Sequence, residues 1–254
     1  MIFVGFYTPF LLYYSHLEVH FVKNLNFIEV FNIIFLIAIV ISDICYLFIN
    51  TSEYITKTIA SSIFVLGGLI NLIYVLKNKK SYSSSPNFKW WMMLGLVSAC
   101  LGDILLIDYF ILGVIFFALG HVLFFISFCM IEKFKLKDIF YGGSLFIVCA
   151  LIILLYKGFD FEGMKFLILI YALIISLMVG KSVSNFTSLK STKNLIVAIG
   201  TILFFLSDFF LLFRLFAGMG RIGSILCLIF YYPAEFVLAY SIYVVSKEKN
   251  HECI

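Results

Sequence analysis

The chain has 254 residues, of which 63% are hydrophobic and only 13% are charged, with a formal net charge of +4. These proportions exclude an ordinary soluble globular domain, in which about a quarter of the residues are charged. The sequence contains no basic patch with interleaved aromatic residues, so it gives no support for binding to nucleic acid. We therefore expect an integral membrane protein surrounded by the lipid bilayer.

Apolar segments long enough to cross a membrane follow one another from residue 27 almost to the end of the chain. A hydrocarbon layer of about 30 Å takes roughly 20 helical residues to cross. Lipid cannot hydrogen-bond a bare backbone, and the segments lack the alternation of barrel strands. The predicted fold is therefore all-α, a polytopic membrane helix bundle with about eight transmembrane helices. Their predicted ranges are 26–49, 57–77, 90–109, 111–131, 138–156, 163–184, 194–217 and 222–246.

The two ends of the chain flank this transmembrane domain, which we assign to residues 26–246. Residues 1–25 lack the basic start and the small-residue cleavage site of a signal peptide, and Pro9 interrupts them. We interpret them as an interfacial or partly inserted segment. Residues 247–254 are predicted to form a cytoplasmic tail.

Basic residues divide unequally between the two faces that eight spans create. Thirteen fall on the face that holds both termini, among them Lys133, Lys135 and Lys181, and five fall on the other face, among them Lys57 and Arg214. Cytoplasmic loops carry the excess of Lys and Arg in membrane proteins. The distribution predicts a cell-membrane protein with its N- and C-termini in the cytoplasm.

Polar and ionisable side chains interrupt the apolar spans at membrane depth. Each costs about 2.5 to 3.5 kcal/mol there if it is charged, so such residues usually face the bundle interior. At a rise of 1.5 Å per residue, the carboxyls on the first, third and seventh spans reach one layer about 20 to 25 Å from the cytoplasmic face. We expect a shared polar cavity, although any single residue could serve only as an interhelical hydrogen-bond partner. The residues are Asp43, Asn71, Asp103, His121, Asp208 and Glu235.

A weak internal repeat involves two of these carboxyls. LGDILLIDYF resembles LSDFFLLFRLF, with Asp103 and Asp208 at matching positions 105 residues apart. Four spans separate the two copies, so both run in the same direction. The repeat suggests two parallel four-helix halves about an axis along the membrane normal, an arrangement known among transporters.

Four segments together carry a family resemblance: LGDILL, GVIFFALGHVLFFISF, GTILFFLSDFFLLFRLF and IFYYPAEFVLAYSIY. In order and spacing they are similar to the signature segments of the YhhN-like lysoplasmalogenase family of integral membrane proteins. The resemblance implies an eight-helix bundle. It also implies hydrolysis of the vinyl ether bond of lysoplasmalogens, a lysophospholipid substrate, to a fatty aldehyde and glycerophosphoethanolamine or glycerophosphocholine, with no cofactor.

The resemblance also implies which residues form the site. The chain departs from the family pattern at Pro233 and Glu235, where a small residue and a glutamine are expected. Glu235 adds a possible negative charge, which bears on the substrate or the pH optimum. The matching positions are Gly102, Asp103, His121, Ser207, Asp208, Tyr231 and Tyr232.

A vinyl ether is cleaved by acid, and the residues at hand suit that chemistry. The reaction needs a proton donor and an anion or base, and two carboxyls in a poorly hydrated cavity can divide these roles. We expect Asp103 and Asp208 to be the catalytic pair, with neither assigned as the acid, since a coupled pair titrates as a unit. His121 could shuttle a proton or orient a carboxylate or the phosphate.

Other polar residues are weaker candidates for support or substrate binding. Tyr231 and Tyr232 could bind water or the headgroup through their hydroxyls. Ser207, Glu235, Asn71 and Asp43 complete the set.

Two other classes of function remain open from the sequence. A transporter or lipid-binding protein could use the same carboxyls for proton coupling, and would favour helices broken in mid-membrane. A metal-dependent intramembrane hydrolase needs about three protein ligands for zinc, but His121 is the one histidine within the predicted bundle. We therefore predict no metal site, and the oligomeric state is left open.

Overall fold

The computed structural model describes residues 26–48, 53–78 and 87–247, and the regular structure within these ranges is entirely helical. The predicted interfacial segment 1–25, and the predicted tail apart from Lys247, lie outside the described residues. The chain divides into two units, Met1–Ile34 and Phe35–Ile254. The described part of the first unit is the start of one helix, and the second unit holds the candidate site.

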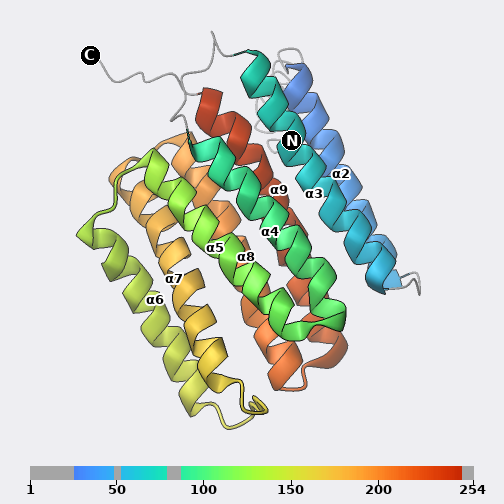
Figure 1. The fold of residues 1–254 in the computed structure, drawn as a ribbon, viewed down its shortest axis with the longest axis vertical. Helices are drawn as coiled ribbons and strands as arrows, with labels where there is room; N and C mark the ends of the chain where they lie inside the picture. The colour runs from blue at the N-terminus through green and yellow to red at the C-terminus, as the bar shows by residue number, and fades with distance from the viewer. Residues whose placement is uncertain (1–25, 49–52, 79–86, 248–254) are drawn as a thin grey trace, which may run out of the picture. The chain divides into compact units, whose positions relative to one another are not determined.

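Eight helices match the eight predicted spans, with every boundary within four residues of its predicted position. Seven of the described helices, from the second to the eighth, are long and apolar enough to cross a membrane, whereas the apolar stretch Phe27–Ser42 of the first is shorter. The predicted all-α membrane bundle is confirmed. The helices are α2 (Phe27–Phe48), α3 (Glu53–Lys77), α4 (Phe88–Asp108), α5 (Phe110–Ile131), α6 (Leu136–Leu155), α7 (Lys165–Ser188), α8 (Thr192–Phe216) and α9 (Gly220–Lys247) (Figure 1).

Local sequence explains several helix ends. Ser191 caps α8, because its Oγ accepts a hydrogen bond from the backbone N–H of Asn194 at 3.4 Å. Beyond the other end of α8, Gly218 adopts a φ of +68°, which glycine reaches without steric cost. Pro233 lies inside α9, where its missing N–H removes one helical hydrogen bond.

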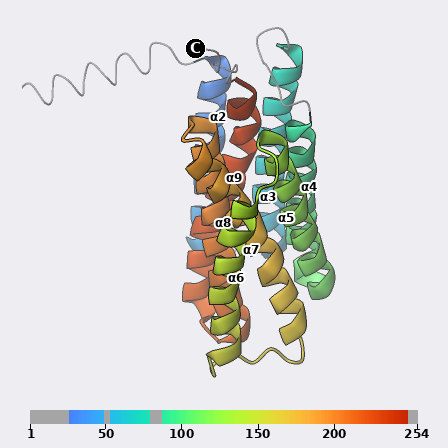
Figure 2. The ribbon, with the colours of Figure 1, turned by 90° about the vertical axis from the view of Figure 1, so that its left-hand side faces the viewer.

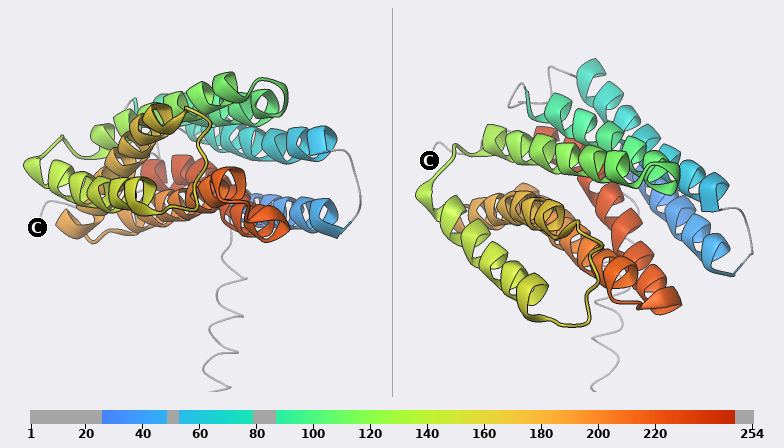
Figure 3. Two further views of the ribbon diagram at one scale, coloured as in Figure 1. Left: turned by 90° about the horizontal axis from the view of Figure 1, so that it is seen from below. Right: turned by 60° about the horizontal axis from the view of Figure 1, so that its bottom comes forward.

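Helix contacts in the second unit recur in pairs. α4 packs on α5 as α8 packs on α9, α3 packs on α4 as α7 packs on α8, and α3 packs on α9 as α5 packs on α7. Figures 2 and 3 show α4 and α5 on one side of this unit and α8 and α9 on the other. These three kinds of contact thus recur between α3–α5 and α7–α9, as an internal repeat predicts, whereas the contact of α4 with α9 has no counterpart among the described helices.

The closest approach of α6 and α7 depends on glycine. A Cβ atom built on Gly180 would lie 2.2 Å from the backbone nitrogen of Gly142 and 2.4 Å from its Cα. Real Cβ atoms do not approach a backbone so closely, so the two helices would have to separate. Small residues at such contacts let membrane helices pack tightly.

We expect Gly180→Ala to lower the free energy of unfolding by about 1 to 3 kcal/mol, the usual cost of overpacking. Thermal unfolding of the purified protein in detergent measures the loss. Gly143→Ala is the matched control, because a Cβ there meets no atom within 4 Å. Equal melting temperatures for the two variants would contradict the tight contact.

A buried ion pair also joins α6 to α7. The Nζ of Lys181 donates to Asp138 Oδ2 at 2.9 Å and to the backbone carbonyl of Lys133 at 3.0 Å. Both charged side chains are buried, at 0% and 1% exposure. The sequence analysis counted Lys181 among the cations of the face that holds both termini. Its side chain reaches Lys133 of that face but is buried, and Asp138 compensates its charge in the low-dielectric interior.

Candidate active site

Asp208 is hydrogen-bonded by two residues from other helices. The hydroxyl of Tyr171, on α7, donates to Asp208 Oδ2 at 2.6 Å. The Nε2 of His121, on α5, lies 3.2 Å from the same oxygen and 2.9 Å from the Tyr171 hydroxyl. Because Tyr171 uses its one hydrogen on Asp208, His121 must carry its hydrogen on Nε2 and donate it. Three helices thus meet at Oδ2 of one carboxyl.

Asp103 has a separate set of partners. Ser61, on α3, donates to Asp103 Oδ2 at 2.5 Å, and Tyr231, on α9, donates to the same atom at 2.8 Å. Asp103 is buried, with 5% of its surface exposed. The Lys57 side chain, one helical turn before Ser61, is also buried and interacts electrostatically with Asp103.

The two carboxyl clusters are one electrostatic group. Asp103, Asp208 and Glu235 on α9 lie close enough to repel one another when they are ionised. Glu235 is fully buried, and among the described residues neither of its carboxyl oxygens has a hydrogen-bond partner. The aromatic ring of Phe204 lies between the clusters, with its centroid 4.7 Å from that of His121 and 5.3 Å from that of Tyr231.

The partners of the two aspartates follow the internal repeat. Each aspartate accepts one hydrogen bond from the helix that precedes it in its own half, from Ser61 of α3 or from Tyr171 of α7. Each is also contacted by the last helix of the other half, through Tyr231 of α9 or His121 of α5. Each half therefore supplies one side chain to the aspartate of the other half: Tyr231 contacts Asp103, and His121 contacts Asp208.

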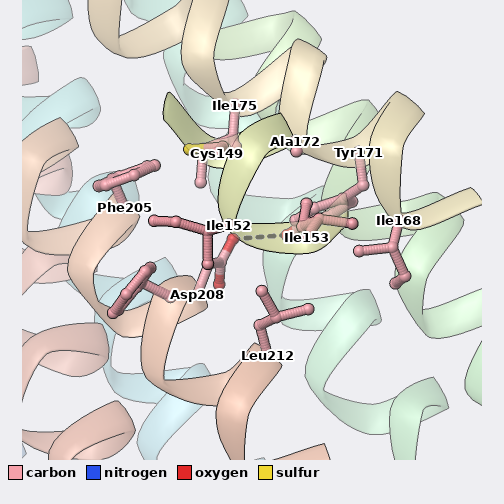
Figure 4. A pocket seen from close by; sticks show the side chains of 11 residues that line it. Cys149, Ile152, Ile153, Ile168, Tyr171, Ala172, Ile175, Phe205, Asp208 and Leu212 are labelled. Atoms are coloured by element: carbon pink, nitrogen blue, oxygen red, sulfur yellow. Dashed lines mark hydrogen bonds between the residues drawn. The ribbon is translucent and has the colours of Figure 1, made fainter. Parts of the chain in front are cut away.

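Two apolar cavities meet at Asp208 and Tyr171. The first lies between α6, α7 and α8, and Figure 4 shows Asp208 on its lining, joined to Tyr171 by a hydrogen bond. The second leads from Asp208 toward Phe110 and Phe216 at the helix ends. Asp208 is the one carboxylate that lines either cavity among the described residues, and 11% of its side chain is exposed.

The structure brings some of the sequence-predicted residues together and leaves others apart. Tyr232 is buried with its ring centroid 4.9 Å from that of Tyr231. Ser207 lies 3.4 Å from the Cys227 sulfur, which joins α8 to α9 beside the cluster. Asn71 bonds the backbone carbonyls of Gly67 and Ala239, where α3 meets α9. The side chain of Asp43 lies outside the described residues.

Three residues of the cluster were missed in the sequence. Tyr171 stands in LILIYALII as one aromatic residue among many, and Ser61 is a small polar residue of a kind that membrane helices commonly contain. Lys57 was assigned to a membrane face. The signal that could have found Tyr171 and Ser61 is depth, because each lies on the span preceding an aspartate, at a similar level in the membrane.

The described carboxyl, imidazole and thiol groups do not converge on a metal position: no three of them lie close enough to hold one ion. The groups that do converge are carboxyl, phenol and imidazole groups, which exchange protons. The chemistry that they offer without a further group is acid–base catalysis.

The chain was compared with known proteins. The model of the YhhN family matches residues 52–242, a range that includes both aspartates and all their hydrogen-bond partners. The family resemblance of the four sequence segments is thereby confirmed. Neither the curated proteins nor the solved structures contain a match to the chain.

Proposed function

Because this chain belongs to the YhhN family of helical membrane proteins, we propose that it is a lysoplasmalogenase, a membrane-embedded hydrolase that cleaves the vinyl ether bond of a lysoplasmalogen. The products are a fatty aldehyde and glycerophosphoethanolamine or glycerophosphocholine. The residues of the chain suffice for this reaction by acid–base catalysis.

One observation carries the proposal: Asp208 lies where two apolar cavities meet, and it is held there by Tyr171 and His121. A single-tailed lipid brings an apolar chain and an acid-labile bond next to each other. A carboxyl group in an apolar cavity is placed to act on that bond.

The first step is protonation of carbon. Because Oδ2 of Asp208 accepts the hydrogen bonds of Tyr171 and His121, its Oδ1 is the oxygen that can hold a proton. Asp208 donates this proton to the alkene carbon farther from the ether oxygen, and positive charge spreads over the other alkene carbon and the oxygen. The ionised Asp208 stabilises that cation, as carboxylates do in glycoside hydrolysis.

Water completes the reaction. It adds to the cationic carbon and gives one hydrogen back to Asp208, which forms a hemiacetal. Asp208 then protonates the ether oxygen as the carbon–oxygen bond breaks, and takes the hemiacetal hydroxyl hydrogen as the aldehyde forms. One water molecule is consumed and the carboxyl group is restored. Tyr171 and His121 act as positioning residues that fix the carboxyl group during these transfers.

Incubation of the purified protein with a lysoplasmalogen and with the matching ester lysophospholipid tests the reaction. We expect aldehyde from the first and no fatty acid from the second, because an ester has no alkene carbon to protonate. Fatty acid release would indicate an ester hydrolase. Turnover of neither lipid would favour the transporter or lipid-binding interpretation.

Tyr171→Phe removes one hydrogen bond from Asp208 and leaves the ring in place. A hydrogen bond to a charged group contributes about 1.5 to 3 kcal/mol, so we expect kcat for aldehyde release to fall about ten- to hundredfold. Tyr109→Phe is the control, since Tyr109 is 61% exposed between α4 and α5. A Tyr171→Phe variant as active as the control would show that the Tyr171 hydroxyl does not position Asp208 for the reaction.

A further inference from the structure

The first cavity is a cleft with one open side. Among the described helices, the backbones of α6 and α8 both pack closely on α7 but not on each other. The two helices meet at one end, where the ring centroids of Tyr156, which follows α6, and Phe213 of α8 lie 5.6 Å apart. α7 forms the floor through Ile168, Ala172 and Ile175, which are buried. Ile152 of α6 and Phe209 of α8 line the two rims and are partly exposed. Because all three helices are long and apolar enough to span a membrane, the open side faces lipid.

The cleft is shorter than a lipid tail. Its lining on α8 runs from Phe205 to Leu212, eight residues whose ends are about 10 Å apart at the helical rise. Asp208 stands three residues from the inner end, which leaves about 5 Å of cleft beyond the carboxyl group. A tail that reaches the middle of the bilayer is about 15 Å long. The cleft can therefore hold the first part of such a tail and not its end.

We infer that the substrate enters sideways from the bilayer between α6 and α8, and that only the part of its tail next to the vinyl ether is held in the cleft. This inference rests on the proposed function for the identity of the lipid. The rest of the tail leaves through the open side and remains among the bilayer lipids.

The inference determines what the protein distinguishes in its substrate. Tail length beyond the cleft and bulk at the tail end should have little effect on turnover, because that part of the tail stays in lipid. Bulky groups on the tail close to the vinyl ether should lower turnover, because the buried side chains of Ala172 and Ile153 close the cleft at its back. A cavity that enclosed the whole tail would instead make turnover depend on tail length and on bulk at the tail end.

Photolabelling tests this arrangement without relying on turnover. The probes are two lysophospholipids with an unreactive alkyl ether in place of the vinyl ether, one with a diazirine on an early carbon of the tail and one with a diazirine on the last carbon. The protein is labelled in phospholipid vesicles, and the labelled peptides are identified by mass spectrometry. We expect the early diazirine to label the cleft, including Ile152 and Phe209, and the terminal diazirine to label exposed positions beyond its inner end, such as Ile147.

Ala172→Phe narrows the cleft and provides the specific variant. Displacing a few methylene groups from the cleft should lower labelling by the early diazirine about tenfold. Leu173→Phe is the matched control, because Leu173 is the next residue of α7 and points outward with 37% exposure. Equal labelling in both variants would overturn the inference, as would terminal-diazirine labelling of the cleft floor.

A turnover assay separates this inference from the proposed function. Lysoplasmalogens with a plain tail and with a bulky fluorophore at the tail end are compared at equal surface concentration. We expect rates within about twofold of each other. Cleavage of the plain lipid alone would overturn side entry and retain the hydrolase, whereas cleavage of neither lipid with cleft labelling intact would retain the lipid site and reject the proposed reaction.

Discussion

Asp208→Asn is expected to lower aldehyde release by about 100- to 10,000-fold, the usual contribution of a group that transfers a proton in the transition state. The amide keeps the size of the side chain, and its oxygen can still accept from the Tyr171 hydroxyl, so the fold should persist. It cannot donate an acidic proton to carbon. A coupled measurement of aldehyde reduction with purified variants in detergent or vesicles gives the rate.

Two further aspartate variants make this result specific. Asp108→Asn changes an exposed carboxyl group at the end of α4 and should leave the rate unchanged. Asp103→Asn should lower the rate less than Asp208→Asn, because Asp103 lines neither cavity. An active Asp208→Asn variant would show that Asp208 does not transfer the proton. A larger loss of rate in Asp103→Asn than in Asp208→Asn would assign proton transfer to Asp103.

Lys181→Met is expected to produce the largest loss of stability of any variant considered. It leaves the Asp138 carboxylate buried without the ammonium that now lies 2.9 Å away. Removing one partner of a buried ion pair costs about 3 to 5 kcal/mol, because the remaining charge is uncompensated. Chemical or thermal unfolding in detergent, followed by circular dichroism, measures the change.

A double variant distinguishes an uncompensated charge from lost packing. Replacing Asp138 by Leu in the Lys181→Met background removes the second charge, so most of the stability should return. Lys190→Met is the surface control, because Lys190 is exposed beyond α7, and it should change stability by less than about 0.5 kcal/mol. A double variant as unstable as Lys181→Met would mean that packing and not charge dominates.

Hydropathy was enough to place the helices, because few structures other than a helix can cross lipid. A spanning backbone must satisfy its own hydrogen bonds, so each apolar stretch of sufficient length becomes a helix. By the same rise per residue, His121 is expected within about 10 Å of the layer of Asp208 along the membrane normal, and its Nε2 lies 3.2 Å from Asp208 Oδ2 in the structure. Depth is readable from sequence because the helical rise is constant.

Hydropathy could not indicate which helices touch and which do not. Every span is apolar on most of its surface, so the sequence gives little sign of which face is turned to lipid. The opening between α6 and α8 and the contact of Tyr171 with Asp208 depend on helix rotation and order. The same limit explains why the sequence did not indicate the burial of Lys181, since a lysine near a helix end can also extend to the membrane surface.

Glu235 is one of the two positions, with Pro233, at which the resemblance implies a different residue. It lies one helical turn after Tyr231, so both side chains lie on the same face of α9. An ionised Glu235 would repel both aspartates. We therefore include its carboxyl group in the proposed site, although the resemblance implies a glutamine at that position.

The origin of the oxygen and hydrogen in the products tests the central claim most directly. The purified protein is incubated with a lysoplasmalogen in heavy water that is also enriched in heavy oxygen, and the products are analysed by mass spectrometry. Protonation of carbon followed by water addition predicts deuterium on the aldehyde carbon next to the carbonyl and no heavy oxygen in the released glycerophospholipid. Heavy oxygen in the glycerophospholipid, or no aldehyde at all, would contradict the account.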